Sequence, residues 1–401
     1  MPEPTFKIGF LINPIAGMGG AVALHGTDAD NHLQALARGA RPLAFERAIR
    51  ALDNYNSNQN EKVRRITFLA PLGQMGGDLL EHLKIDFLGI SGFESQITQA
   101  EDTRSLCQEF IAAGVDLILF AGGDGTARDI YSIAGSEIPM LGIPAGVKMR
   151  SSVFTHFPEG VSQILQEVES REKIEVIHRE ILDAASSDPA MGNYSQSTFY
   201  GVASSLKSQV SLSSAKAKKT LENDPGIAEL VEKLASEIME KSDELVLVGC
   251  GTTTFSLKKI LGTDYTLQGV DAIFQGRCVG QDLTESEILE KISTYKKVSL
   301  ITGVIGGQGF LFGRGNQQLS SRVISEITWP NIYVIAAEAK LLGLFPVELF
   351  VDFDSNEQNL QMPTFVRVHT SPSRDMLVRV RTPFYSIAKE SVRQLVRSGN
   401  E

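Results

Sequence analysis

Residues 115–134 read VDLILFAGGDGTARDIYSIA, and this stretch decides the fold. The run from Val115 to Ala121 is typical of a buried strand, the glycines mark a loop, and the remainder has helical spacing. The same order of strand, glycine-rich loop and helix begins at residues 6–12 and again at residues 65–70. Three such units predict a parallel sheet with helices packed on it.

The second half of the chain has a different pattern. A helix is expected over residues 224–240, and several short strands follow between residues 245 and 381. A length of 401 residues also favours two domains. The sequence therefore predicts an α/β protein: a Rossmann-like parallel-sheet domain over residues 1–150, and a β-rich α+β domain over residues 151–401.

Composition narrows the class of protein. The net charge of −10 argues against broad nucleic-acid binding, which needs a basic surface. No apolar run approaches the length of a membrane span, and the N-terminus lacks the basic region of a signal peptide. Three cysteines without a C-x-x-C pair favour a reducing compartment, so a cytoplasmic location is expected. The six scattered histidines give no metal-binding pattern, and metal ligands remain unassigned.

The loop after the strand at residues 115–121 is the strongest candidate site. Gly122, Gly123, Gly125 and Thr126 let main-chain N–H groups approach a phosphate at the start of a helix. Asp124 would repel a phosphate, so it is expected either to accept the proton of an attacking hydroxyl or to help hold Mg²⁺. The competing interpretation is a helix cap, because aspartate is a favoured N-cap residue.

Other polar and glycine-rich segments are weaker candidates. The N-terminal segment NPIAGMGG can bind phosphate or form a simple turn, and Lys148 can offset phosphate charge or be solvated. The segment GGQGFLFGRGNQQ at residues 306–318 can contact a ligand or form a hairpin, and GTTT at residues 251–254 can bind a ligand or cap a helix. The expected phosphate-binding residues are Asn13, Gly17, Gly19, Gly20 and Lys148. The expected substrate-binding residues are Thr252, Thr253, Gly307, Gln308, Arg314 and Asn316.

Two common nucleotide-binding motifs are absent from the sequence. No G-x-G-x-x-G follows an expected strand, and no G-x-x-x-x-G-K-[ST] occurs anywhere. A dinucleotide-binding fingerprint and a P-loop are therefore excluded.

Taken together, the segments INPIAGMGG, AGGDGTARDI, LGIPAGVKMRSSVF and IGGQGFLFGRGNQQLS resemble the ATP-NAD kinase-like family of the AcoX type, within the superfamily of NAD kinases and diacylglycerol kinases. The resemblance covers residues 6–350. It implies an enzyme that transfers a phosphoryl group from ATP or polyphosphate, with Mg²⁺, to a hydroxyl of NAD⁺. It also implies that Asp124 accepts the proton and that the glycine-rich loops bind the nucleotide phosphates. By analogy with related kinases, a homo-oligomer is expected.

The acceptor side of the resemblance is incomplete. NAD kinases carry an Asn-Glu or Asn-Asp pair after GGDGT, and no such pair can be placed here. A kinase of another small hydroxyl or ketone metabolite, or of a lipid, therefore remains a second hypothesis. A nucleotide-binding regulator without catalysis is the third, although the presence of Asp124 argues against it.

Overall fold

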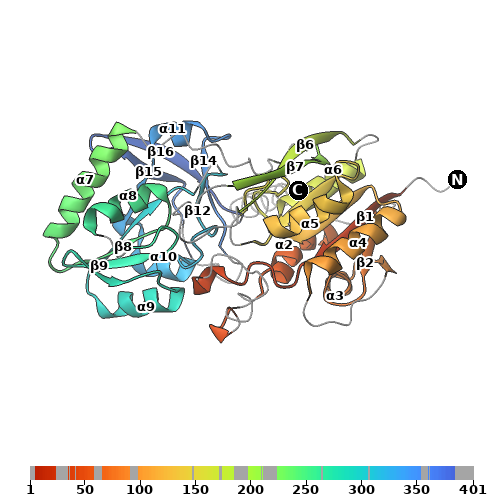
Figure 1. The fold of residues 1–401 in the computed structure, drawn as a ribbon, viewed down its shortest axis with the longest axis horizontal. Helices are drawn as coiled ribbons and strands as arrows, with labels where there is room; N and C mark the ends of the chain where they lie inside the picture. The colour runs from red at the N-terminus through yellow and green to blue at the C-terminus, as the bar shows by residue number, and fades with distance from the viewer. Residues whose placement is uncertain are drawn as a thin grey trace, which may run out of the picture. The chain divides into compact units, whose positions relative to one another are not determined.

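The computed structural model describes residues 5–23, 35, 37–40, 42–57, 66–90, 98–146, 149–170, 174–184, 197–208, 210, 224–262, 265–305, 308–353, 360 and 362–383. The chain forms two compact units, whose helices and strands are labelled in Figure 1. Unit 1 comprises Met1–Met18 and Gly26–Ala215, and unit 2 comprises Gly19–His25 and Lys216–Glu401. Each unit has its own sheet and its own hydrophobic core.

Unit 1 is built on a five-stranded parallel sheet with the strand order β3-β2-β1-β4-β5. Its strands are β1 (Phe6–Ile12), β2 (Ile66–Pro71), β3 (Phe87–Ile90), β4 (Leu117–Gly122) and β5 (Met140–Pro144). Every residue of β4 is buried, as expected for a strand covered on both faces. The carboxyl ends of β1 and β4 meet at one edge of the sheet, because Ile12 pairs with Ala121.

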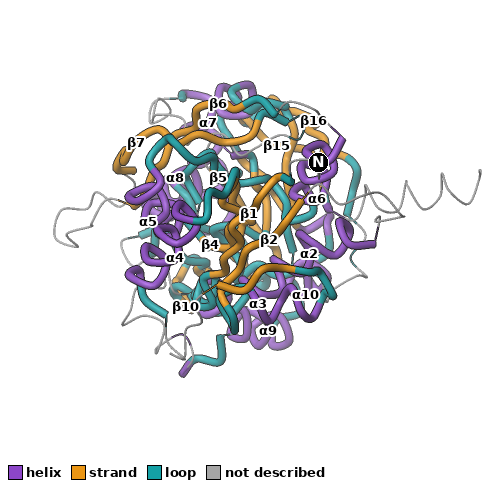
Figure 2. Tube along the Cα trace, turned by 90° about the vertical axis from the view of Figure 1, so that its right-hand side faces the viewer, coloured by secondary structure: helices purple, strands orange, loops and turns teal. Residues whose placement is uncertain are grey.

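Helices cover both faces of this sheet. They are α2 (Ala44–Ser57), α3 (Gly77–His82), α4 (Ala100–Ala112), α5 (Asp124–Ala134) and α6 (Gly160–Ser170). Apolar residues of α2, α3 and α6 form one core with the sheet, and those of α4 and α5 form another. Figure 2 shows α4 and α5 on one side of the strands and α2 and α6 on the other.

A two-stranded antiparallel sheet extends unit 1 past its last parallel strand. It consists of β6 (Val176–Ala184) and β7 (Ser197–Leu206). Ile181 and Ala203 are fully buried in the core that also contains α4 and α5. Because this packing ties β6 and β7 to the N-terminal sheet, the division between the units falls at residues 215 and 216, later than the boundary expected at residue 150.

Unit 2 contains a nine-stranded mixed sheet with the order β10-β9-β8-β11-β13-β15-β16-β14-β12. The four strands from β8 to β15 in this order are parallel, and β9 and β16 run antiparallel to their neighbours β8 and β15. The strands are β8 (Leu245–Val248), β9 (Asp271–Phe274), β10 (Arg277–Gly280), β11 (Val298–Gly303), β12 (Phe310–Phe312), β13 (Ile332–Ile335), β14 (Glu348–Val351), β15 (Phe365–Ser371) and β16 (Arg374–Arg381).

Helices again cover both faces of the sheet of unit 2 (Figure 1). One core contains α7 (Pro225–Glu240) and α8 (Thr252–Leu261). The other contains α9 (Glu285–Thr294), α10 (Ser321–Ile327) and α11 (Glu338–Leu342). Short 3₁₀ turns occur at Gly20–Val22 and Trp329–Asn331.

The predicted fold class is confirmed. A parallel-sheet α/β unit is followed by a unit with a mixed sheet and helices, as the sequence predicted. Among the described residues, no helix combines the length and the hydropathy needed to cross a lipid bilayer.

Candidate active site

Asp124 lies at the carboxyl end of β4, where the chain turns into α5. Gly122 is the last residue of β4, Gly123 is the N-cap in extended conformation, and Asp124 is the first residue of α5. No side chain caps this helix, so Asp124 does not act as its N-cap. The helix-cap interpretation of the sequence therefore does not explain this carboxylate.

The carboxylate of Asp124 is bound by main-chain groups that follow β5. The N–H of Arg150 donates to Oδ2 over 2.7 Å, and the N–H of Ser151 donates to Oδ1 over 2.9 Å. Ser151 is itself fixed to β6, because its hydroxyl donates to the carbonyl of Leu182 and accepts from the N–H of Leu182. Asp124 is only 6% exposed, and its carboxylate is held by the segment after β5, which is in turn fixed to β6 through Ser151.

Burial raises the pKa of Asp124 to about 7, from an ordinary value of 3.8. The hydrogen bonds from Ser151 and Arg150 act in the opposite direction, and the negative charge of Asp183 raises the pKa further. A carboxylate that titrates near neutral pH is suited to accept a proton from a hydroxyl.

This pKa predicts opposite pH effects on rate and stability. If Asp124 is the general base, kcat/KM should rise with pH up to about 7, because only the ionised form accepts a proton. The free energy of unfolding should fall as the pH rises from about 4 to about 7. In that range the carboxyl of Asp124 keeps its proton in the folded state and has lost it in the unfolded state. Denaturant titrations and kcat/KM profiles over this range check both effects. Asp124→Asn should remove both, and a profile unchanged in that variant would contradict the assignment.

Asn13 and Thr126, two of the expected phosphate-binding residues, lie within hydrogen-bond distance of one another. The side-chain amide of Asn13 donates to the hydroxyl of Thr126 over 2.9 Å, and its oxygen accepts from the N–H of Ile15. This pair ties the loop after β1 to the start of α5. Because these two side chains bind one another, the loop after β1 and the start of α5 offer a ligand mainly their main-chain N–H groups.

The glycines of the two loops differ in the space that a side chain would have. Gly17 has a φ of +84°, and a Cβ there would lie 2.2 Å from the carbonyl oxygen of Ala145. A Cβ on Gly122 would lie 2.6 Å from the hydroxyl of Thr126, so both glycines allow close packing of neighbouring chain segments. Among the described residues outside its own helix backbone, a Cβ on Gly125 would meet only the guanidinium of Arg128, at 3.9 Å. A side chain could therefore be accommodated at Gly125 but not at Gly17 or Gly122.

Three further predicted phosphate-binding residues are Gly19, Gly20 and Lys148. By its contacts, the segment that holds Gly19 and Gly20 belongs to unit 2, and a Cβ on Gly20 would lie 2.7 Å from the side chain of Gln317. Lys148 lies outside the described residues.

Thr252 and Thr253 form the first turn of α8 in unit 2, at the carboxyl end of β8. Gly251 is the N-cap, and its N–H donates to the carbonyl of Leu267. Thr252 is exposed and Thr253 is half-buried, and no acidic residue lies in this first turn. The turn is therefore accessible and its dipole is not neutralised by a carboxylate.

The predicted substrate-binding residues in the segment from Gln308 to Gln318, which includes β12, are mostly buried. Arg314 is 3% exposed, its Nε lies 3.4 Å from Oδ2 of Asp352, and its guanidinium lies 4.2 Å above the ring of Phe310. Asn316 is fully buried and donates to the carbonyl of Leu311. Gln308 is also buried, and Gly307 lies outside the described residues. The side chains of Arg314 and Asn316 therefore stabilise the segment itself.

Replacing Arg314 by Lys should test this internal role. Lysine keeps the charge beside Asp352, but it lacks the planar group that stacks on Phe310, so the free energy of unfolding should fall by about 0.5–2 kcal/mol. Ligand affinity should stay within about twofold, because the side chain has no exposed face. Urea unfolding and calorimetric titration measure the two quantities, and a stable variant with weakened ligand binding would show that Arg314 contacts the ligand.

Two ion pairs were missed by sequence reasoning. Lys258 Nζ lies 2.8 Å from Asp271 Oδ2 with both side chains fully buried, and Arg128 Nη1 lies 2.7 Å from Asp183 Oδ2. A lysine on the apolar side of an expected helix was a signal for the first pair. The second pair joins residues 55 positions apart, and nothing local in the sequence indicates it.

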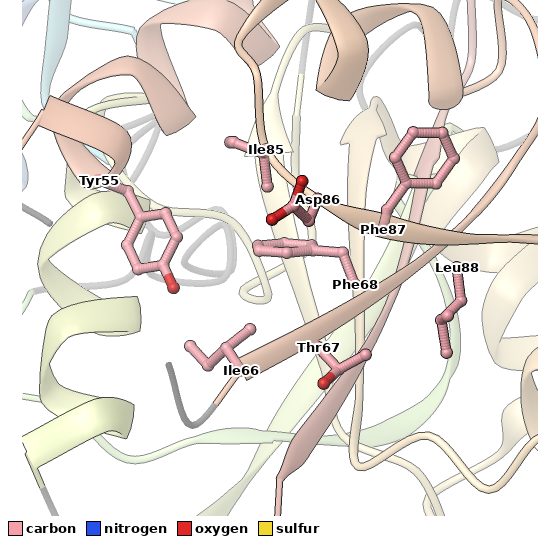
Figure 3. Close-up of a pocket in the computed structure, with 8 residues that line it drawn as sticks. All are labelled: Tyr55, Ile66, Thr67, Phe68, Ile85, Asp86, Phe87 and Leu88. Atoms are coloured by element: carbon pink, nitrogen blue, oxygen red, sulfur yellow. The ribbon is translucent and has the colours of Figure 1, made fainter. Parts of the chain in front are cut away.

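A pocket of about 260 Å³ in unit 1 lies away from this site (Figure 3). Tyr55, Ile66 and Asp86 are among its lining residues, and it adjoins the amino ends of β2 and β3. Asp124 is at the carboxyl end of the sheet, where ligands of such folds bind. Among the described residues, no group of three or more His, Cys, Asp or Glu side chains is placed to hold a metal ion.

Residues 8–173 match the family model of the ATP-NAD kinase N-terminal domain. The matched region contains β1, the loop with Asp124 and α5, and it supports the NAD kinase family and a phosphotransferase activity. No curated protein matches the sequence.

Two solved structures show only distant similarity to the chain. A conserved domain protein from Vibrio cholerae is 10% identical, with 84% of this chain and 75% of that chain covered and a TM-score of 0.24. A UDP-N-acetylglucosamine 2-epimerase is also 10% identical, with coverages of 87% and 74% and a TM-score of 0.22. Similarity this low carries no argument about function.

Proposed function

We propose that the chain is an ATP-dependent kinase that phosphorylates the adenosine ribose hydroxyl of NAD⁺, of the AcoX type within the ATP-NAD kinase-like proteins. The observation that carries the proposal is the buried carboxylate of Asp124, bound at the start of α5 with a pKa of about 7. The family match over residues 8–173 supports the same chemistry.

In the proposed reaction, Asp124 accepts the proton of the attacking hydroxyl. The hydroxyl oxygen forms a bond to the γ-phosphorus of ATP, the bond from that phosphorus to the bridging oxygen breaks, and ADP leaves. The first N–H groups of a helix have no partner within it, so those at Gly125 and Thr126 can face the phosphate. Mg²⁺ bound by the ATP phosphates would neutralise part of their charge.

On the acceptor side, Thr252 and Thr253 are proposed to contact the substrate, because they are accessible at the start of α8. Gln308 and the main chain of the segment from Gln308 to Gln318 are proposed as further substrate contacts. Arg314 and Asn316 contribute by shaping this segment, since both side chains are buried within it.

A second candidate acceptor is another small hydroxyl compound. The burial of Arg314 and Asn316 favours it, because fewer polar side chains are then left to read a ribose or a nicotinamide. The donor chemistry at Asp124 is the same for both acceptors.

Product analysis by mass tests the proposal. The protein is incubated with Mg²⁺, with ATP or polyphosphate as the donor, and with NAD⁺ alone or in a mixture of hydroxyl metabolites. NADP⁺ is the expected product, and a different phosphorylated product would identify the second acceptor class. Nucleotide binding without any phosphorylated product would contradict a kinase and support a regulator.

The proposal also covers the binding partners, the oligomeric state and the cellular location. The partners are small nucleotides and not nucleic acids or membranes, and assembly into a homo-oligomer is proposed by analogy only. The described cysteines Cys107, Cys250 and Cys278 form no disulfide, which suits the proposed cytoplasmic location.

A further inference from the structure

Arg128 lies one helical turn after Asp124, on the same face of α5. Its guanidinium is the only group that a Cβ on Gly125 would approach within 4 Å, at 3.9 Å, among the residues described. The side chain of Arg128 is 37% exposed. A cationic group therefore lies beside Gly125, in the first turn of α5, which also contains Asp124.

The guanidinium of Arg128 is held from three directions. Nη1 lies 2.7 Å from Oδ2 of Asp183, Nη2 lies 3.6 Å from Oδ1 of Asp129, and the group lies 5.7 Å above the ring of Tyr200. Asp183 is on β6 and Tyr200 is on β7. A guanidinium fixed in this way loses little conformational freedom when it binds an anion. It has five N–H donors, which is more than these contacts use.

Asp183 acts on Arg128 and on Asp124. Its negative charge raises the pKa of Asp124, so the two carboxylates oppose one another in the folded state. The pair of Asp183 with Arg128 is partly exposed, and ion pairs of this kind add little to stability. A buried carboxylate with a raised pKa and charged neighbours is typical of functional sites.

We propose that Arg128 contacts the phosphate chain of the donor and that Asp183 is the positioning residue that holds its guanidinium. This inference rests on the proposed phosphoryl transfer and extends it to β6 and β7, which lie beyond the matched residues 8–173. Arginine suits the role because its fork matches the oxygens of a phosphate.

Calorimetric titration with tripolyphosphate, ATP and adenosine tests the inference without requiring turnover. The variants of the full chain are Arg128→Gln, Arg128→Lys and Asp183→Asn. The matched control is Arg104→Gln, because Arg104 also pairs with Asp129, over 3.0 Å, and its side chain is similarly exposed at 34%. Thermal unfolding of each variant confirms that it is folded.

Arg128→Gln should weaken tripolyphosphate and ATP binding by about 10- to 100-fold, as expected for a lost charged hydrogen bond, and leave adenosine binding unchanged. Arg128→Lys should recover part of the loss, Asp183→Asn should weaken binding about threefold to tenfold, and Arg104→Gln should stay within about twofold. If Arg128→Gln does not fold, the lysine and asparagine variants carry the test.

Two results would overturn the inference. One is normal tripolyphosphate binding in every Arg128 and Asp183 variant that folds, and the other is a wild-type chain that binds neither tripolyphosphate nor ATP. The proposed kinase activity is judged separately by its product. If the wild type binds tripolyphosphate, Arg128→Gln does not, and no acceptor is phosphorylated, the kinase proposal fails and the inference stands.

Discussion

Asp124→Asn is expected to lower kcat by about 10²- to 10⁴-fold, the usual contribution of a positioned general base. The amide cannot accept a proton from the attacking hydroxyl, although it has nearly the same size. Affinity for ATP should be retained or increased, because a negative charge beside the phosphates is removed. Steady-state turnover and calorimetric titration measure the two effects.

The stability of Asp124→Asn should change much less than its turnover. The amide oxygen can accept only one of the N–H groups of Arg150 and Ser151, so one hydrogen bond is lost, but a buried charge is removed as well. Asp116→Asn is a matched control, because Asp116 accepts the main-chain N–H of Lys7 at the opposite end of β4. Its turnover should equal that of the wild type. A folded Asp124→Asn protein with similar turnover would remove Asp124 from the mechanism.

Lys258→Met is expected to lower the free energy of unfolding by about 3–5 kcal/mol, because it leaves a buried carboxylate without its cation. The ammonium of Lys258 donates to Asp271 and to the carbonyls of Thr266 and Gly269. Burial lowers the pKa of Lys258, and the charge of Asp271 acts against this shift. The network fastens the segment before β9 to the last turn of α8, so its loss should also loosen the end of that helix.

The adjacent Lys259 provides the control for this prediction. Lys259 is exposed, and its ammonium lies 5.0 Å above the ring of Phe255. Lys259→Met should change the free energy of unfolding by no more than about 0.5 kcal/mol. Urea denaturation of both variants gives the comparison, and equal midpoints would show that the buried pair adds nothing to stability.

The sequence predicted those parts of the fold that depend on local pattern. The apolar run before GGDGT is β4, and the helical spacing after it is α5, because both signals arise from neighbouring residues. The parallel sheet followed from the repetition of this unit. The extent of unit 1 did not, since Ile181 and Ala203 enter its core only through tertiary packing.

For the candidate site as well, the sequence indicated what depends on neighbouring residues and not what depends on tertiary contacts. Asp124 was identified from its loop, but the roles of Ser151 and Leu182 depend on where β6 is placed. For Arg314, a polar residue among glycines suggested a ligand contact, and nothing in the sequence indicated that its side chain is buried on Phe310. Sequence pattern shows which groups are present, and only the folded chain shows which of them are already engaged.

Isotope transfer tests the central claim most directly. ATP labelled with heavy oxygen in its γ-phosphate is supplied with Mg²⁺ and NAD⁺, and the product is analysed by mass. If the account is right, NADP⁺ carries the heavy oxygens of the transferred group, and Asp124→Asn forms it at least about 10²-fold more slowly. Labelled inorganic phosphate with no labelled NADP⁺ or other phosphorylated acceptor would show that the chain hydrolyses ATP without transferring its phosphate, and would contradict the account.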